Sequence, residues 1–200
     1  MVTLMQRRRE MMLRASGAPL PEWDYEWDYT KGLLEDNGWN VAKVSTGNAS
    51  YSISGTYLKV SGNNSSYYNF SYPTQYDKCV LEAEVYMEAS QNVIRINAPG
   101  TAEHQLGVRL QYSSNYKGIY LGTSTSGTKL ATINYAQIYK VKLVINEGVG
   151  QAYLDDVLIG DNIDTTVDMS TQVGFFSGRG AGSTFRSNRL YSLKMKFNRI

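Results

Sequence analysis

From Trp23 to Phe197 the chain alternates apolar and polar residues with a period of two, and this alternation constrains the fold more than any other feature. Leu81 and Ala83 would point to one side of a strand, and Glu82 and Glu84 to the other. Such strands form sheets that pack on a core with one face and meet water with the other. Sixteen tyrosines and eighteen glycines suit short strands joined by tight turns.

The segments with this alternation are separated by turns rich in Gly, Ser and Asn, without the spacing of parallel strand–helix–strand units. Many short strands in this arrangement are typical of sandwiches and jelly rolls. We therefore predict an all-β fold, an antiparallel β-sandwich (jelly roll) over residues 21–200. The predicted strands cover 40–46, 49–54, 56–61, 66–71, 78–88, 92–97, 105–112, 116–122, 129–134, 138–146, 150–155, 171–177 and 188–198.

Residues 1–20 form a basic, methionine-rich segment that differs from the rest. Its apolar residues share one face at helical spacing, and Pro19 and Pro21 would end the helix. We predict a short helical arm that docks on a partner or on another copy of the chain. Residues 23–29 alternate aromatic and acidic side chains, and their aromatic face would pack on the core or form a subunit interface. The predicted assembly residues are Leu4, Met5, Arg7, Arg8, Arg9, Met11, Met12, Trp23 and Trp27.

The net charge of +2 is unevenly distributed. Four arginines against one glutamate give the arm a charge of +3, which leaves −1 for the other 180 residues. A nearly neutral body argues against nucleic-acid binding, which needs clustered cations. Cys79 is the single cysteine, so an intramolecular disulfide is excluded and we expect a small buried residue. The arginines are followed by too short an apolar run for a signal peptide, and no stretch reaches transmembrane length.

Two later stretches resemble a known family. Residues 139–148 end at a Gly turn and are followed by a hairpin over residues 151–160, with Asp155 and Asp156 at its apex. This pair resembles the paired strands of concanavalin A-like and laminin G-like sandwiches, as residues 173–177 resemble a late strand of that family. The resemblance implies a concanavalin A-like jelly roll.

The leader Leu4-Met-Gln-Arg-Arg-Arg-Glu-Met-Met12, with Leu20-Pro21 soon after, resembles the starts of phage and prophage proteins. It implies a virion structural protein made in a bacterial cytoplasm. Its partners would be other virion proteins or copies of itself, reached through the arm, with no membrane and no nucleic acid.

The polar faces of three successive runs and of the strand after them carry the candidate glycan-binding residues. Amide and charged groups can meet sugar hydroxyls, and tyrosine rings can stack on a pyranose. In concanavalin A-like sandwiches the concave sheet often carries the ligand, which the resemblance extends to these residues. The alternative is a solvated sheet with cross-strand ion pairs. The candidates are Glu82, Glu84, Tyr86, Arg95, Asn97, Arg109, Gln111 and Tyr120.

Catalysis and metal binding have weaker signals. A glycosidase needs two suitably spaced carboxyl groups. In sandwich glucanases these groups lie in a segment that resembles Glu-x-Asp-x-x-Glu, and residues 82–88 depart from that pattern. We therefore predict no enzyme. Calcium is the one candidate cofactor, because acidic loop residues offer oxygen ligands. The alternative is that these residues are ordinary acidic hairpin tips without a metal. The calcium candidates are Asp155, Asp156, Asp161 and Asp164.

Three hypotheses follow for function. The first is a virion component (tail, fibre or decoration protein) whose sandwich binds a glycan or a protein surface. The second is a structural spacer without a ligand. The third is a glycan-cleaving hydrolase of the concanavalin A-like class.

Overall fold

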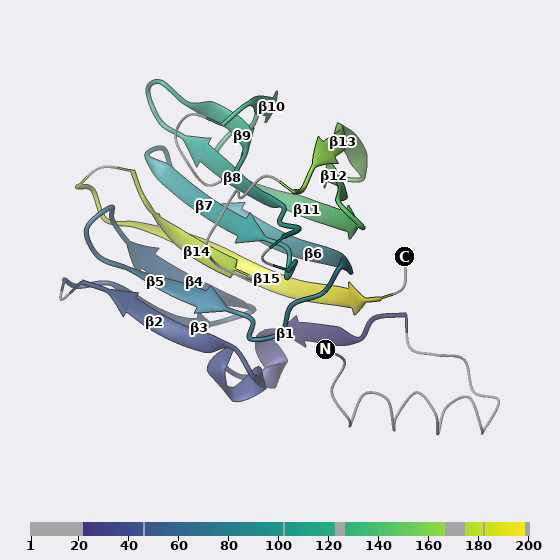
Figure 1. The fold of residues 1–200 in the computed structure, drawn as a ribbon. Coiled ribbons are helices and arrows are strands. Elements are labelled where there is room, and N and C mark those ends of the chain that lie inside the picture. Colours follow the sequence, from purple (N-terminus) through teal and green to yellow (C-terminus); the bar gives the residue numbers. More distant parts are fainter. Residues whose placement is uncertain are drawn as a thin grey trace.

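The computed structural model describes residues 22–45, 47–101, 103–122, 127–166, 175–181 and 183–198. Two antiparallel sheets lie against each other as the layers of a sandwich (Figure 1). No α-helix occurs in these ranges, which hold only two short 3-10 turns, η1 (Tyr29–Lys31) and η2 (Glu35–Asn37). The all-β sandwich is thereby confirmed, while the predicted helical arm lies outside the described residues.

Sheet A has eight strands in the order β13-β12-β11-β6-β15-β4-β3, with β1 pairing on β15. Its long central strands β6 and β15 pair over nine residue positions, from Asn188↔Met87 to Phe197↔Cys79. Its strands are β1 (Tyr25–Asp28), β3 (Ser50–Ser54), β4 (Tyr57–Gly62), β6 (Lys78–Met87), β11 (Gln137–Asn146), β12 (Val149–Leu154), β13 (Val157–Asp164) and β15 (Arg186–Phe197).

Sheet B has seven strands in the order β10-β9-β8-β7-β14-β5-β2. The chain passes from sheet A to sheet B between β6 and β7, so these successive strands do not pair with each other. Sheet B consists of β2 (Asn40–Val44), β5 (Tyr67–Ser71), β7 (Asn92–Asn97), β8 (Gly107–Tyr112), β9 (Lys117–Leu121), β10 (Lys129–Ala131) and β14 (Phe175–Gly180).

The core lies between the two sheets and is built from the apolar side of each alternation. Leu81 of β6, Ile94 of β7 and Val108 of β8 are fully buried, and Leu193 of β15 is 1% exposed. Burial of side chains this large stabilises the fold by about 1.5–3 kcal/mol each. The period-two prediction of the buried face is therefore confirmed.

The aromatic segment at the start of sheet A packs mainly inward. Trp27 is 1% exposed, and its Nε1 donates to the Gly32 carbonyl at 3.0 Å. Tyr25 is half-buried, and its ring packs against Trp39 and Tyr72. Trp27 was predicted as an assembly residue, and this is wrong because β1 pairs with β15 and places the ring in the core.

The glycine content of the run 177–183 predicts a flexible loop between strands, with Arg179 at the rim of the sandwich, but residues 177–180 belong to β14. Two glycines allow close approach of neighbouring groups, as glycines in strands often do. A Cβ on Gly178 would lie 2.9 Å from the Asn188 Cβ, and one on Gly180 would lie 1.9 Å from the Thr184 carbonyl oxygen. The strand therefore continues through the run, and Arg179 lies on a sheet rather than in a loop.

Cys79 lies in β6 and is fully buried, as expected for a structural cysteine. Burial raises the pKa of its thiol to about 12. Because the thiolate is the reactive form of cysteine, this thiol is protected both sterically and electrostatically in the folded chain.

Candidate functional site

The topology divides the predicted glycan-binding residues between the two sheets. The sequence pattern treated three successive runs as neighbours on one wet face, since consecutive strands are usually adjacent. The chain crosses between sheets after β6, however, so the predicted single face is wrong. Glu82, Glu84 and Tyr86 lie on sheet A, and Arg95, Asn97, Arg109, Gln111 and Tyr120 lie on sheet B.

On sheet A the two glutamates face basic cross-strand neighbours. Glu82 lies opposite Lys142 and Lys194. Glu84 lies opposite Lys140, and its Oε2 accepts a hydrogen bond from Ser192 Oγ at 3.3 Å. These are the contacts of a solvated, charge-alternating sheet face, which contribute a few tenths of a kcal/mol each, roughly.

Tyr86 also belongs to this surface of sheet A. The Arg189 guanidinium carbon lies 4.6 Å from the centre of the Tyr86 ring and 4.5 Å from that of Tyr57. Arg189 additionally forms an ion pair with Glu88 at 3.5 Å. The charge of this arginine is thus balanced within the protein.

A cavity of about 420 Å³ lies on the outer side of sheet A. Trp23 stands at one side of it, near the ammonium groups of Lys194 and Lys196, and Tyr153 stands under the Lys142 ammonium at 4.4 Å. The lining residues are Glu22, Trp23, Val80, Glu82, Lys142, Val144, Gln151, Tyr153 and Lys196.

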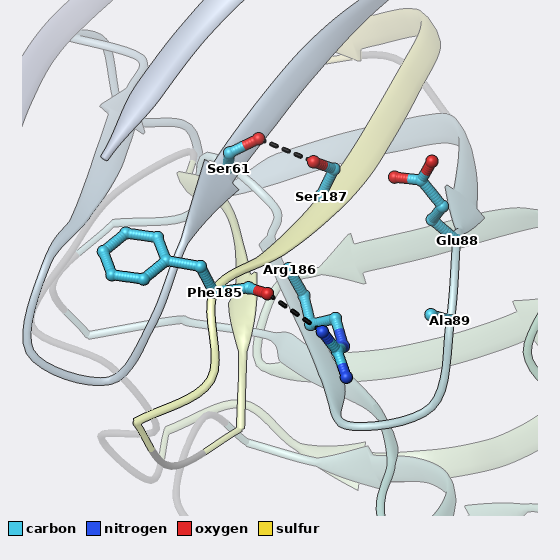
Figure 2. A pocket seen from close by; sticks show the side chains of 6 residues that line it. All are labelled: Ser61, Glu88, Ala89, Phe185, Arg186 and Ser187. Atoms are coloured by element: carbon cyan, nitrogen blue, oxygen red, sulfur yellow. Dashed lines mark hydrogen bonds between the residues drawn. The ribbon is translucent and has the colours of Figure 1, made fainter. Parts of the chain in front are cut away.

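A second cavity, also of about 420 Å³, lies beside the end of β6 and the start of β15 (Figure 2). Its polar side chains contact protein partners: Ser61 Oγ and Ser187 Oγ are 2.7 Å apart. Arg186 donates to the carbonyls of Ser90 and Phe185 at 3.1 and 3.2 Å. The cavity therefore offers the partly exposed Phe185 ring but commits its arginine to the backbone. Its lining consists of Ser61, Glu88, Ala89, Phe185, Arg186 and Ser187.

The outer face of sheet B gathers arginines and tyrosines from several strands. Arg95 of β7 lies directly opposite Arg109 of β8, and Arg109 lies opposite Tyr120 of β9. Arg179 of β14 lies opposite Val93. Val93 is two residues from Arg95 in β7 and therefore points to the same face of the sheet. We call this surface the arginine–tyrosine face, and define it by Tyr67, Arg95, Arg109, Tyr116, Tyr120 and Arg179.

The rings of this face lie against the guanidinium groups. The Arg109 guanidinium carbon is 5.0 Å from the centre of the Tyr120 ring and 5.5 Å from that of Tyr116. The Arg179 guanidinium carbon is 4.1 Å from the centre of the Tyr67 ring. Such cation–π contacts contribute about 0.5–2 kcal/mol each, depending on desolvation.

The arginines are also unusually buried for charged side chains. Arg109 is 1% exposed and Arg179 is 8% exposed. Burial, followed by the nearby charges of Arg179 and Arg109, lowers the pKa of Arg95 to about 10. Burial likewise lowers the pKa of Arg109 and of Arg179.

Buried polar groups lie beside the face and contact the strands that carry it. Gln111 is 7% exposed and donates from Nε2 to Ser113 Oγ at 3.2 Å. Asn97 lies opposite Gly107, where a Cβ would approach its Oδ1 to 2.1 Å. From sheet A, the buried Asn188 donates from Nδ2 to the Arg179 carbonyl at 3.3 Å and so holds β14 in place.

Sequence reasoning placed five residues of sheet B on the side away from the core and expected that side to be wet. Four of them are buried instead, with exposed fractions of 3%, 1%, 7% and 8% for Asn97, Arg109, Gln111 and Tyr120. The prediction did not include Tyr67, Tyr116 or Arg179 in the site. Tyr67 stands at an outward position of a predicted strand, so its alternation could have identified it. Arg179 was expected at the rim of the sandwich, and only the strand pairing of β14 with β7 shows that it lies beside Arg95.

The four calcium candidates each contact another group of the protein. Within the described ranges no group of three or more His, Cys, Asp or Glu side chains could hold a metal ion. Asp155 Oδ1 accepts from the Lys140 amide and Asp156 pairs with the Lys140 ammonium. Asp161 Oδ1 accepts from Gln151 Nε2 and Asp164 Oδ1 accepts from the Thr166 amide, both at 2.9 Å.

The remaining predicted assembly residues, Leu4, Met5, Arg7, Arg8, Arg9, Met11 and Met12, lie outside the described residues. Trp23 lies at the cavity of sheet A and is partly exposed. In the part of the chain that the structure describes, no helix is long and apolar enough to cross a membrane.

No family model matches this chain. No curated protein matches it either. Solved structures do match. The chain superposes on a protein named sialidase with a TM-score of 0.63 at 12% identity, covering 87% of this chain and 18% of that one. It thus spans about a fifth of the length of that protein.

Two further matches cover most of both chains. The exoplasmic/lumenal domain of VIP36, in a Ca²⁺/Man3GlcNAc-bound form, has a TM-score of 0.51 at 14% identity and covers 82% of this chain and 85% of its own. Carbohydrate-binding module CBM66 from Bacillus subtilis has a TM-score of 0.52 at 12% identity, with 80% and 95% covered. At these identities the matches show the fold, a concanavalin A-like sandwich shared by lectin, carbohydrate-binding and glycosidase structures.

Proposed function

We propose that this sandwich is a non-enzymatic binding module that holds a glycan on its arginine–tyrosine face. The observation that carries the proposal is the convergence of arginine and tyrosine side chains on the outer side of β7, β8, β9 and β14. Tyrosine rings offer a flat apolar surface to a sugar ring. Guanidinium groups donate in a planar fork that suits neighbouring oxygens of a ligand. The lectin and carbohydrate-binding structures among the fold matches support this choice.

Binding rather than cleavage is proposed because of the chemistry of the face. Hydrolysis of a glycosidic bond uses two carboxyl groups, one of them an acid. The described part of the arginine–tyrosine face presents cations and phenols. The candidate glutamates Glu82 and Glu84 lie on the other sheet beside lysines. A sialidase and xylosidases are among the fold matches, so turnover assays belong beside the binding assays.

A glycan array tests the proposal with the full chain, the Arg95→Ala variant and the Arg189→Ala variant. We expect the wild-type chain to bind a subset of glycans and Arg95→Ala to bind them about tenfold or more weakly. A hydrogen bond to a charged group contributes about 1.5–3 kcal/mol, and about 1.4 kcal/mol is tenfold in affinity. Arg189 lies on sheet A, so its variant should bind like the wild type.

Three results would contradict the proposal. Binding that survives in Arg95→Ala but falls in Arg189→Ala would move the glycan to sheet A. A full chain that binds no glycan would favour the structural spacer without a ligand. Release of sugar from a bound glycan would instead favour the hydrolase.

We propose further that the chain works as a virion-associated protein anchored through residues 1–20. The support is the resemblance of residues 4–12 to phage and prophage leaders, together with the +3 charge of the segment. In this setting the arm contacts another virion protein or a second copy, and the sandwich contacts the glycan. Synthesis would take place in the bacterial cytoplasm.

Solution mass tests whether the arm mediates self-association. We expect light scattering to show an oligomer for the full chain and a monomer for a chain that begins at Pro19. A monomer in both cases would contradict self-association and leave another virion protein as the proposed partner. An oligomer in both cases would assign assembly to the sandwich and contradict the anchoring role.

A further inference from the structure

The arginine–tyrosine face carries three arginines close together. Two arginines directly opposite each other on neighbouring strands repel, and such like-charged pairs destabilise a sheet. Arg95 and Arg109 form exactly such a pair, and Arg179 adds a third cation within electrostatic range of Arg95. Burial strengthens this repulsion because it removes the screening by water.

We propose that the bound glycan is acidic, and that its anionic group docks on the guanidinium groups of Arg95 and Arg179. The inference rests on the proposed function and adds the chemical class of the ligand. The anionic group is a carboxylate or a sulfate, since both present oxygens that match the guanidinium fork. The sugar ring would then lie against the neighbouring tyrosines.

The hydrogen-bonding state of these two side chains supports the proposal. The Nε atoms of Arg95 and Arg179 are buried without a hydrogen-bond partner. Neither arginine forms an ion pair with any carboxylate in the described ranges. A buried charged donor without a partner is costly. The Arg179 guanidinium also hydrogen-bonds the Tyr67 side chain, so the two Nε atoms are the donors that remain for a partner from outside the chain.

Arg189 on the opposite sheet provides an internal comparison. It also lies against two tyrosine rings, Tyr57 and Tyr86. Its Nε is likewise buried without a hydrogen-bond partner, but unlike Arg95 and Arg179 this arginine forms an ion pair with Glu88, at 3.5 Å. The chain thus supplies a carboxylate to an arginine–tyrosine cluster on sheet A, and supplies none from its described residues to Arg95 or Arg179.

The ionisation of Arg95 agrees with this view. Burial and the two neighbouring arginines lower its pKa to about 10, which means that the folded protein disfavours its charged form. An anion placed between Arg95 and Arg179 would favour the charged form and raise that pKa again. Anion binding would therefore also stabilise the fold through linkage.

A paired glycan array tests the inference on the full chain. The pairs share a sugar skeleton and differ in charge: oligogalacturonates and their methyl esters, sialyllactose and lactose, and sulfated and desulfated galactans. We expect the acidic member of at least one pair to bind about tenfold or more tightly than its neutral partner. The preference should weaken as salt is raised from 50 to 500 mM, because salt screens charge–charge contacts.

Variants connect the preference to the two arginines. In Arg95→Met and in Arg179→Met, we expect the acidic preference to fall by about tenfold. In Arg95→Lys it should fall less, because a charge remains while the planar fork is lost. Arg189→Met is the matched control and should keep the full preference. Circular dichroism of each variant confirms that a loss of binding is not a loss of fold.

The outcomes separate this inference from the proposed function. An acidic preference seen only in the carboxylate pairs, or only in the sulfate pairs, would identify which of the two anionic groups is recognised. If neutral glycans bind as tightly as acidic ones and Arg95→Met keeps their order, the acidic ligand is wrong while glycan binding stands. If no glycan of either kind binds, both proposals are wrong.

Discussion

Replacement of Trp27 by alanine is expected to lower the free energy of unfolding by about 3–5 kcal/mol, the range for large aromatic side chains removed from a core. Trp27 is 1% exposed and lies opposite Leu193, itself buried at 1% exposure. The substitution leaves a cavity between β1 and β15 and removes the hydrogen bond from Nε1 to the Gly32 carbonyl. Urea unfolding followed by tryptophan fluorescence measures the effect as a lower midpoint.

Trp23 provides a control of the same residue type in the same segment. It is partly exposed and contacts the Lys194 and Lys196 ammonium groups at 5.8 and 5.5 Å from its ring. Trp23→Ala should therefore cost less than about 1 kcal/mol. Equal losses of unfolding free energy in both variants would contradict the inward packing of β1 and would indicate that Trp27 lies at the surface.

Replacement of Arg95 by methionine is expected to raise the free energy of unfolding of the ligand-free chain by about 1–2 kcal/mol, because apolar side chains of similar volume often stabilise a site of buried charge. The substitution removes the repulsion from Arg109 and Arg179 and the buried Nε without a partner. For a domain of this size each kcal/mol shifts the melting temperature by about 2–4 °C. Differential scanning calorimetry without added anions measures the shift.

Arg189→Met is the matched substitution with the opposite expected sign. It removes the ion pair with Glu88 and the contacts with the Tyr57 and Tyr86 rings. We expect a loss of about 0.5–1 kcal/mol. If Arg95→Met destabilises the chain as much as Arg189→Met does, then Arg95 contributes to the stability of the fold. That result would contradict the inference that its charge is balanced by a ligand.

The alternation was sufficient to predict most of the strands and the buried face of each one. Four residues of β6 are fully buried: Leu81, Ala83, Val85 and Met87. Every second side chain of a strand points to the same face, so these four all lie on the side of β6 that packs on the core. β13 was predicted only in part, through the hairpin over residues 151–160. It is an edge strand whose Val157 and Leu158 are 64% and 45% exposed, and Ile163 is its one buried residue, so its alternation is weak.

The candidate site was harder to predict, because it depends on which strands are neighbours. Alternation shows which side of a strand Glu84 and Arg95 occupy, but it does not show that β6 and β7 lie in different sheets. That difference results from the pairing of β6 with β11 and β15, strands at least fifty residues away in sequence. Arg179 was placed in a loop because glycines are typical of turns, whereas its neighbours Gly178 and Gly180 are needed for close packing.

The buried Cys79 has a practical consequence for studying this protein. It is the one cysteine of the chain, and it is inaccessible in the folded state. A second cysteine introduced at an exposed position, such as Ser52→Cys in β3 of sheet A, would be the only thiol to react with a maleimide dye under native conditions. Fluorescence probes can therefore be attached to chosen sites without first removing the natural cysteine.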